Sequence, residues 1–567
     1  MPHAMSMPAT GLQALILCGP GSSFPTFTSN PDECPKALLP IANRPMVWYP
    51  MDFCLRMGTT SITLICPPSA SEALTTAFNT NPFLTGLPLP RPDILAPAGL
   101  DQNTGTAEIL RLPEIRELVK SDFIILPCDL VCELAGEKLL QAWMVKSASL
   151  NDLLESSSFS NSCQSRHSGG LGGWDNTKAT STTSTAAVKG EETDFIATAP
   201  LPWSPVASPE GSVFHNLSKL VYSTPTDSLN DLVEARKALP IRHGLLKSNP
   251  RVRMYTTHRD AHMYIFPRWI LDFVQANDRL DSIGEDVVGW LAKAGWQRGL
   301  AEKLHVDTMC KGKPTKANDS SSTESSSSPR DGSPVGRFTF KGNTLVPPAT
   351  ADTRQTRDKG SHSTDAAQFE VPPVLAYIHA TENQINPPLI RRVDTAQLLL
   401  ATSLQLAKLP SIEEVGDAAS PFAHARKIAY PEGVKSRTTI TKQDSLLAEN
   451  VTVEEKTSIK ETVVGANCQI KEGAKLTQCL LMEGVVVGKG CKLSKCILGK
   501  RCVIGDGSIL ADCEVQENLL VEPRTEDKDN KLMSSEGLEA TEAEREKVLQ
   551  AVDEEVAAVM QRATMSD

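Results

Sequence analysis

Several common features are missing from this 567-residue sequence, and each absence excludes a class of protein. There is no secretory signal and no apolar run long enough to cross a bilayer, so a cytosolic protein with no membrane contact is expected. None of the 14 cysteines forms a Cys-x-x-Cys pair, so a zinc site is not predicted and free thiols in a reducing compartment are. The net charge of −11 argues against direct DNA binding.

Histidine is also absent beyond His424, and this matters because the chain repeats itself there. Three sets of apolar residues recur at one constant interval, equal to the separation of Leu447 from Val464. Within one interval, the members of the three sets follow one another in steps of six, six and five residues. Short apolar steps of this kind predict a three-sided β-solenoid in which each face is one strand and each corner a turn. The three sets are Leu447, Val464, Leu481, Leu498 and Val515; Val453, Ile470, Val487 and Ile504; and Ile459, Leu476, Leu493 and Leu510.

Small residues are expected at the corners of these coils, and many glycines are available for them. These glycines are Gly465, Gly473, Gly488, Gly490, Gly499, Gly505 and Gly507. Cys479, Cys496 and Cys513 share the interval and should stack as a column of buried thiols. Acyltransferases built on such coils use a histidine as general base, so its absence here favours a scaffold over an enzyme.

The amino-terminal half has the pattern of a doubly wound α/β domain. Leu12–Leu17 reads as a buried parallel strand, followed by a loop, a helix and a second strand over Ser61–Cys66. This βαβ order predicts a Rossmann-like sheet. A later strand, Phe123–Pro127, leads to Asp129, and open α/β sheets hold ligands at such carboxyl ends.

Several motifs in this half resemble the nucleotidyltransferases that make nucleotide sugars. They are Gly19 and Gly21, the run Pro35-Lys36-Ala37-Leu38-Leu39-Pro40, Asn43 with Pro45, Gly105-Thr106-Ala107, and Asp129. In that family the glycine loop carries an arginine that holds the triphosphate, and the aspartate holds magnesium. The resemblance therefore implies a nucleotide pocket formed by Gly19, Gly21, Lys36 and Asp129.

The departures from that pattern indicate that the pocket is vestigial. Ser23 stands where the family has its arginine, and it cannot offer a bidentate cation to phosphate. His262 occupies the position of a glycine at which the sugar approaches. We therefore predict no catalytic residue, no metal and no cofactor, and interpret Lys36 and Asp129 as residues that the fold retains.

A nucleotidyltransferase-like domain followed by a left-handed solenoid resembles, in particular, the gamma subunits of eukaryotic translation initiation factor 2B. Further likenesses are Ala376-Tyr377-Ile378 and Arg392-Val393-Asp394-Thr395. The resemblance implies a non-catalytic subunit of a guanine-nucleotide exchange factor, which pairs with an epsilon subunit and assembles with alpha, beta and delta subunits in a decamer. Its client would be initiation factor 2. The alternative is an active sugar-nucleotide pyrophosphorylase.

The composition of the sequence also predicts how the chain divides into domains, insertions and a tail. Two stretches rich in Ser, Thr and Gly lack apolar periodicity and are expected to be disordered insertions. The resemblance to the epsilon subunit stops before that subunit's catalytic helical domain, because only an acidic segment follows the coils. The predicted divisions are 1–154 and 213–310 (α/β domain), 155–212 and 311–367 (insertions), 368–439 (end of the α/β domain and connector), 440–520 (left-handed β-helix) and 521–567 (acidic tail with an amphipathic helix).

Overall fold

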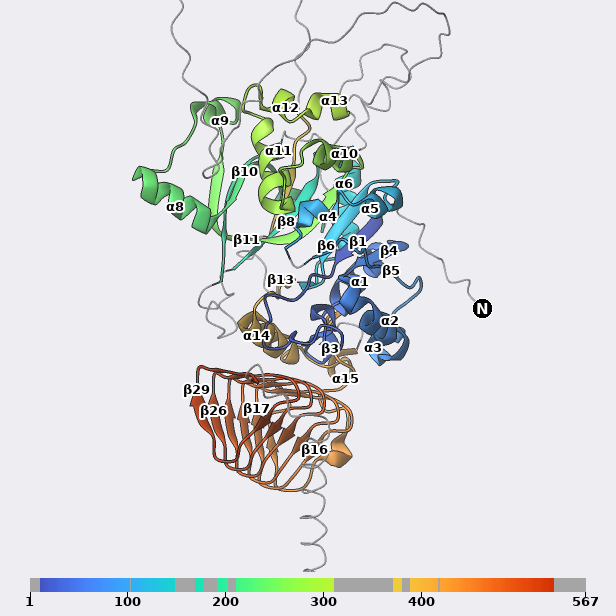
Figure 1. The fold of residues 1–567 in the computed structure, drawn as a ribbon, viewed down its shortest axis with the longest axis vertical. Coiled ribbons are helices and arrows are strands. Elements are labelled where there is room, and N and C mark those ends of the chain that lie inside the picture. The colour runs from blue at the N-terminus through green and yellow to red at the C-terminus, as the bar shows by residue number, and fades with distance from the viewer. Residues whose placement is uncertain are drawn as a thin grey trace, which may run out of the picture.

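The computed structural model describes residues 11–101, 103–147, 169–177, 191–201, 211–310, 371–379, 388–416 and 419–534. An α/β domain lies above a three-sided parallel β-helix, with helices α14 and α15 near the junction (Figure 1). The predicted fold class is confirmed for both parts. Within the described residues, no helix combines the length and apolar character that spanning a bilayer requires.

The α/β domain is organised around a nine-stranded mixed sheet in the order β5-β4-β1-β6-β11-β8-β12-β10-β9. Its opening β1–α1–β4 unit is parallel, as the sequence predicts, and β6 joins on the other side of β1. The strands are β1 (Gln13–Leu17), β4 (Ser61–Ile65), β5 (Asp93–Leu95), β6 (Phe123–Pro127), β8 (Leu171–Asn176), β9 (Asp194–Ala199), β10 (Leu217–Pro225), β11 (Arg253–Phe266) and β12 (Leu375–Ile378).

Helices cover both faces of this sheet, because side chains alternate between two buried cores. Ala14 and Ile16 belong to one core, with α1, α2, α6 and α14, whereas Leu15 belongs to the other, with α5, α10 and α11. The helices are α1 (Trp48–Met57), α2 (Ser71–Thr80), α3 (Pro82–Thr85), α4 (Thr106–Ile109), α5 (Pro113–Leu118), α6 (Gly136–Ser147), α8 (Thr226–Arg236), α9 (His243–Ser248), α10 (Trp269–Ala276), α11 (Gly289–Ala294), α12 (Leu300–Lys303), α13 (Val306–Cys310), α14 (Ala396–Ala407) and α15 (Ile412–Val415). Short elements include η1 (Lys36–Leu38), β2 (Pro40–Ile41), β3 (Arg44–Pro45), β7 (Leu130–Cys132), the π-helix η4 (Ile283–Val288) and β13 (Ile390–Arg392).

The prediction of one disordered insertion over 155–212 is wrong in two places. Strands β8 and β9 lie within it, and both are buried parts of the central sheet. Each is a short run that depends on partners far away in the sequence, β11 and β12 for β8 and β11 for β9, so local composition conceals them. The insertion predicted over 311–367 and the tail helix lie outside the described residues.

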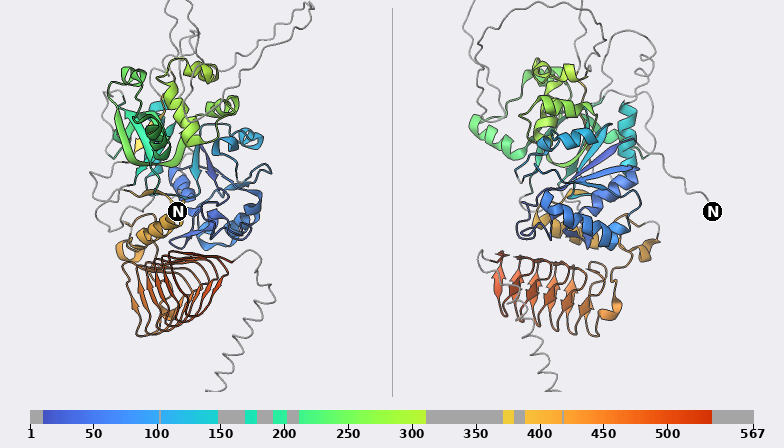
Figure 2. Two further views of the ribbon diagram at one scale, coloured as in Figure 1. Left: turned by 60° about the vertical axis from the view of Figure 1, so that its left-hand side comes forward. Right: turned by 45° about the vertical axis from the view of Figure 1, so that its right-hand side comes forward.

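Three parallel sheets form the β-helix, one along each side, and successive coils stack along one axis (Figure 2). The first sheet contains β14 (Thr439–Ile440), β17 (Ser458–Lys460), β20 (Lys475–Thr477), β23 (Lys492–Ser494), β26 (Ile509–Ala511) and β29 (Glu526–Lys528). The second contains β15 (Leu446–Leu447), β18 (Val463–Val464), β21 (Leu480–Leu481), β24 (Ile497–Leu498), β27 (Glu514–Val515) and β30 (Lys531–Leu532). The third contains β16 (Thr452–Val453), β19 (Gln469–Ile470), β22 (Val486–Val487), β25 (Val503–Ile504) and β28 (Leu520–Val521).

All three predicted apolar columns point inward, and every one of their residues is at most 2% exposed. The cysteine column, Cys479, Cys496 and Cys513, is buried with them as predicted. The coils extend beyond the predicted 440–520, from bridges at Ile428 and Val434 to β30. The sequence repeat did not predict the first coil, because Ile428 pairs with Leu447 and these two residues are separated by more than the constant interval.

The corners are made in part as predicted, since Gly473, Gly490 and Gly507 lie at them with positive φ, but most corner residues are not glycine. Each coil turns through residues with positive φ, and these form three columns of their own at the same interval. Only one column is mainly glycine, and the others use residues that tolerate the left-handed conformation or are held in it by the coil. The columns are Lys456, Gly473, Gly490, Gly507 and Arg524; Asn450, Asn467, Gly484, Arg501 and Asn518; and Glu461, Gln478, Lys495, Asp512 and Asp529.

A fourth apolar column attaches the β-helix to the α/β domain. Leu446, Val463, Leu480 and Ile497 face outward from the second sheet, yet they are buried in the core that includes α14. Asn43 strengthens this junction by donating its side-chain N–H to the carbonyl of Val464 at 3.0 Å. The outer face of the second sheet therefore belongs to a core of the α/β domain, whereas the interior of the β-helix is a separate core.

The inward columns give a direct test of the β-helix. We expect Leu476→Ala, which empties a fully buried site on β20, to lower the local free energy of unfolding by about 2–5 kcal/mol. Hydrogen exchange of the β-helix amides, followed by mass spectrometry, measures this quantity. Thr477→Ala, at the exposed next position, should change it by less than about 0.5 kcal/mol. Equal effects of the two substitutions would contradict the assignment of inward and outward faces.

Candidate functional site

Lys36 and Asp129, predicted as parts of one pocket, are in direct contact. Lys36 lies in η1 after Pro35, and Asp129 closely follows β6 at the carboxyl end of the parallel strands. The Lys36 Nζ donates to Asp129 Oδ2 at 2.7 Å, and the two side chains are only 11% and 1% exposed. The structure therefore brings these two residues together as a buried ion pair.

A second cation also faces Asp129, and the sequence did not reveal it. Strand β13 pairs with β7, and in this pairing Arg392 lies opposite Leu130. The Arg392 Nε is therefore 3.5 Å from Asp129 Oδ1. Burial by itself would raise the pKa of Asp129, but Lys36 and Arg392 outweigh it and hold that pKa below its usual value. Burial would likewise lower the pKa of Lys36, but Asp129 outweighs it and raises that pKa. All three groups are therefore charged.

These contacts begin a longer series of alternating charges, which we call the ion-pair chain. Its members are at most 23% exposed, and neighbouring members lie within 3.9 Å of each other. Asp394 Oδ2 lies 3.8 Å from a terminal nitrogen of Arg392 and 2.5 Å from one of Arg259. The ion-pair chain consists of Lys36, Asp129, Arg392, Asp394, Arg259, Glu191 and Arg391. It joins segments from across the α/β domain.

His262 lies beside this series and has a backbone conformation that glycine adopts more readily than histidine does. Its φ is +51°, in the left-handed region that a non-glycine residue rarely adopts. The Asp260 carboxylate accepts the His262 backbone N–H at 2.9 Å and also the Tyr264 hydroxyl. Burial and the nearby Arg392 keep the pKa of His262 well below its usual value, so the imidazole is neutral. Its ring now occupies space near the Asp129 carboxylate.

The glycine loop takes part in the junction between the two domains. Gly21 has a φ of +90°, and a Cβ there would lie 2.9 Å from the Thr28 side chain, so glycine is required. Gly19 is exposed, and a Cβ there would meet nothing within 4 Å. Phe24 is buried, with its ring centroid 5.7 Å from the Lys36 Nζ, whereas Ser23 is exposed.

The segment that follows the glycines reaches the β-helix. Thr26 donates to Glu514 Oε2 at 2.8 Å, and Ser29 accepts from the Gln516 side chain at 3.0 Å. An ion pair of 2.8 Å joins Glu33 to Arg501. This loop near the start of the sequence is thus bound to coils near its far end.

The chemistry available at this site follows from its charges. A divalent cation prefers free carboxylate oxygens, but both oxygens of Asp129 already face cations of the chain itself. Within the described parts of the chain, no group of three or more His, Cys, Asp or Glu side chains is placed to hold a metal. Lys36 is equally engaged, so phosphate would have to compete with Asp129 for it.

The buried ion pairs predict a large stability effect at Asp129. We expect Asp129→Asn to lower the free energy of unfolding by about 3–5 kcal/mol, because it leaves Lys36 and Arg392 buried without a counter-charge. Chemical denaturation followed by tryptophan fluorescence measures this loss. Asp272→Asn is the matched control, since the Asp272 side chain is 43% exposed and its ion pairs should be worth less than about 1 kcal/mol. A loss at Asp129 as small as that at Asp272 would contradict the description of the site.

Comparisons with known proteins connect this geometry to a family. A family model described as the EIF2B subunit epsilon LbH domain, a left-handed β-helix, matches residues 429–526. The chain is also 25% identical, over 294 residues, to the translation initiation factor eIF2B subunit gamma of Schizosaccharomyces pombe. That match covers 52% of this chain and 54% of the relative, so the chain spans about half the length of the relative it matches.

The two similarities agree with the order of domains in the structure. The matched model covers the coils from just before β14 to β29, and the coils follow an α/β domain of the nucleotidyltransferase-like type. The model is named for the epsilon subunit and the relative is a gamma subunit, so both similarities point to the same factor. The chain is therefore similar to an eIF2B gamma subunit, both in sequence and in the order of its two domains.

Proposed function

We propose that this chain is a non-catalytic subunit of the eIF2B guanine-nucleotide exchange complex. It pairs with an epsilon subunit and helps to bind initiation factor 2 while GDP is replaced by GTP. Alpha, beta and delta subunits complete the assembly, a decamer in the cytosol. The proposal rests on the similarity to a gamma subunit and on one observation from the site.

That observation is the pairing of Asp129 with Lys36 and Arg392. Nucleotidyl transfer would need the carboxylate for magnesium and the lysine for phosphate, and each now neutralises the other. Ser23 adds no compensating cation in the glycine loop, which is instead bound to the β-helix. The geometry thus favours a structural use of the domain over a pyrophosphorylase.

Nucleotide exchange does not require a catalytic residue in every subunit. It requires binding energy that favours the nucleotide-free client over its GDP-bound form. A subunit whose two domains are joined through a hydrophobic core can hold one part of the client in a fixed position while another subunit acts on the nucleotide. A rigid body of this kind suits that task.

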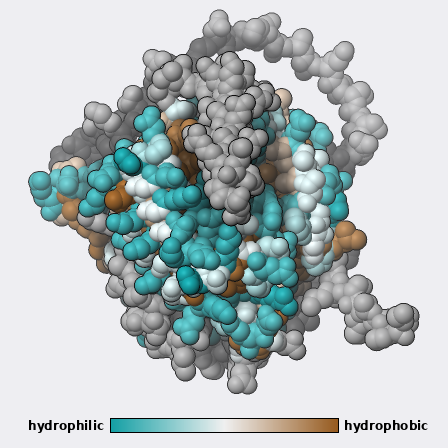
Figure 3. Space-filling view, turned by 90° about the horizontal axis from the view of Figure 1, so that it is seen from below, coloured by the Kyte–Doolittle hydropathy of each residue, from teal (hydrophilic) through white to brown (hydrophobic). Residues whose placement is uncertain are grey.

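The β-helix presents a surface suited to a protein partner. Val486, Val503 and Leu520 lie at outward positions in consecutive coils of the third sheet, and Leu520 is 56% exposed. The corresponding outward column of the second sheet, Leu446 to Ile497, is covered by α14. Outside the grey atoms, the face of the molecule seen from below is mainly hydrophilic with small hydrophobic patches (Figure 3). We propose that this short apolar column contacts another subunit.

The proposed function predicts an assembly and an activity. When co-expressed with the epsilon subunit of the same organism, the chain should purify with it as a complex. GDP release from initiation factor 2 should be faster with the complex than with epsilon alone. The purified chain, given GTP or UTP, a sugar 1-phosphate and magnesium, should release no pyrophosphate. Sustained pyrophosphate release, or no effect on GDP release, would contradict the proposal.

The outward apolar column predicts which surface the epsilon subunit contacts. Val503→Glu should greatly reduce co-purification with epsilon, because it places a charge in an apolar contact without altering the inward-facing core. Thr452→Glu is the matched control, since it makes an outward change at the other end of the same sheet. If both variants purify with epsilon equally well, this column is not the contact.

A further inference from the structure

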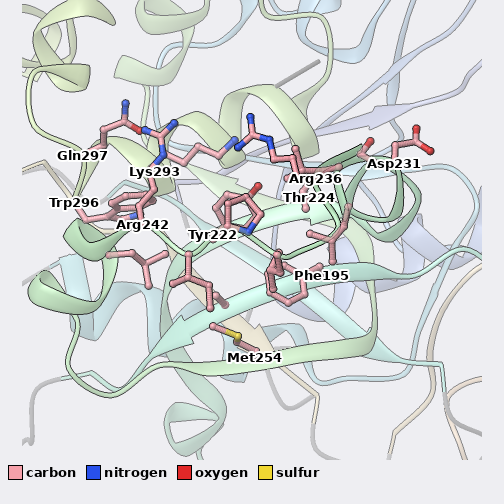
Figure 4. Close-up of a pocket in the computed structure, with 18 of the residues that line it drawn as sticks. Phe195, Tyr222, Thr224, Asp231, Arg236, Arg242, Met254, Lys293, Trp296 and Gln297 are labelled. Atoms are coloured by element: carbon pink, nitrogen blue, oxygen red, sulfur yellow. The ribbon is translucent and has the colours of Figure 1, made fainter. Parts of the chain in front are cut away.

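A cavity lies away from the ion-pair chain and has no role in the proposed function. Its volume is about 600 Å³, within the range of small-molecule sites. It lies beside β9 and β10, between helices α8 and α11, with α9 and the first residues of β11, which pair with β9, also in its lining. Figure 4 shows the residues that line it.

Lys293, on α11, is the unusual residue of this cavity. It is only 8% exposed, and its Nζ lies 5.0 Å from the ring centroid of Tyr222 and 4.8 Å from that of Trp290. Within the described residues it forms no ion pair and no hydrogen bond through Nζ. Burial, together with the nearby Arg242, lowers the pKa of Lys293 to about 8. Asp286 offsets part of this shift, but among the described residues no carboxylate contacts the ammonium group, whose neighbours are the two aromatic faces.

Positive charges also outnumber negative charges in the lining of the cavity. Arg236, Arg242 and Lys293 line it, against a single carboxylate from Asp231, which leaves two positive charges in excess. The two arginines are exposed at the rim and are free to turn towards a ligand. In Figure 4 the nitrogen-bearing ends of the three cations gather along one side of the cavity.

The opposite side is apolar, with Phe195 buried and Met254 partly exposed. Phe195 and Met254 lie there in Figure 4. Phe195 packs edge-to-face on Tyr222, with 6.0 Å between ring centroids, and the β9–β10 ladder holds both. The Trp296 indole N–H donates to the carbonyl of Val221 at 2.8 Å, which orients that wall. The cavity is therefore preformed, with a cationic side and an apolar side.

We propose that this cavity binds a small organic phosphate monoester. The phosphate contacts Lys293 and Arg242, and the organic part packs on Phe195 and Met254. A phosphate monoester carries about two negative charges near neutral pH, which matches the excess in the lining, whereas a carboxylate carries one. An isolated inorganic phosphate would leave the apolar side unfilled.

Phenyl phosphate is a suitable probe because it combines the two parts in one small molecule. We expect it to bind the full chain saturably, with one site, in isothermal titration calorimetry. Arg242→Gln and Lys293→Gln should each weaken the binding by about tenfold or more, since each removes a charge-assisted contact. Lys247→Gln is the matched control, because Lys247 is exposed on α9 and does not line the cavity. It should leave the affinity unchanged.

Two further ligands separate the contributions of the two sides. Inorganic phosphate and benzyl alcohol should each bind much more weakly than phenyl phosphate. The proposal is overturned if phenyl phosphate does not bind or if benzyl alcohol binds as tightly as phenyl phosphate. It is also overturned if Arg242→Gln leaves the affinity for phenyl phosphate unchanged. Arg242 is exposed, so its substitution is expected to leave the fold intact even if Lys293→Gln unfolds the chain. Because the ligand site is remote from Asp129 and the β-helix, its failure would leave the proposed subunit function standing.

Discussion

The constraint on which the α/β domain depends is the buried carboxylate of Asp129. A charge that is 1% exposed is tolerable only with a counter-charge at close range, and this chain supplies two. Lys36 comes from the loop after the first strand, and Arg392 comes from the segment that leads into α14. One interaction thus closes the carboxyl end of the sheet and also fixes the path of the chain towards the β-helix.

That path explains why the two domains form one body. Thr395 accepts the Leu398 N–H and begins α14, whose apolar side chains then cover the outward column of the second solenoid sheet. From the other side, the glycine loop reaches the coils through Thr26, Ser29 and Glu33. Segments that would handle nucleotide in a related enzyme therefore serve the junction here. A fixed orientation between domains suits the subunit role proposed above.

Much of this architecture could be predicted because it follows from patterns among residues that are close together in the sequence. The constant interval of the apolar columns identified the solenoid and its inward face, and the βαβ order identified the sheet. What escaped prediction depends on contacts between distant segments. Strands β8 and β9 become strands because β11 and β12 lie beside β8, and β11 lies beside β9. Arg392 became part of the site through its register with Leu130, which lies in a distant part of the sequence. The corners escaped in part, because Asn, Lys and Asp adopt positive φ there alongside glycine.

The most direct test of this account is a high-resolution structure of the chain determined with saturating magnesium and GTP or UTP. The account predicts that the Lys36 Nζ remains on Asp129, that Arg392 remains opposite, and that no metal is bound to the carboxylate. A magnesium ion on Asp129, with Lys36 moved onto a bound triphosphate, would contradict it.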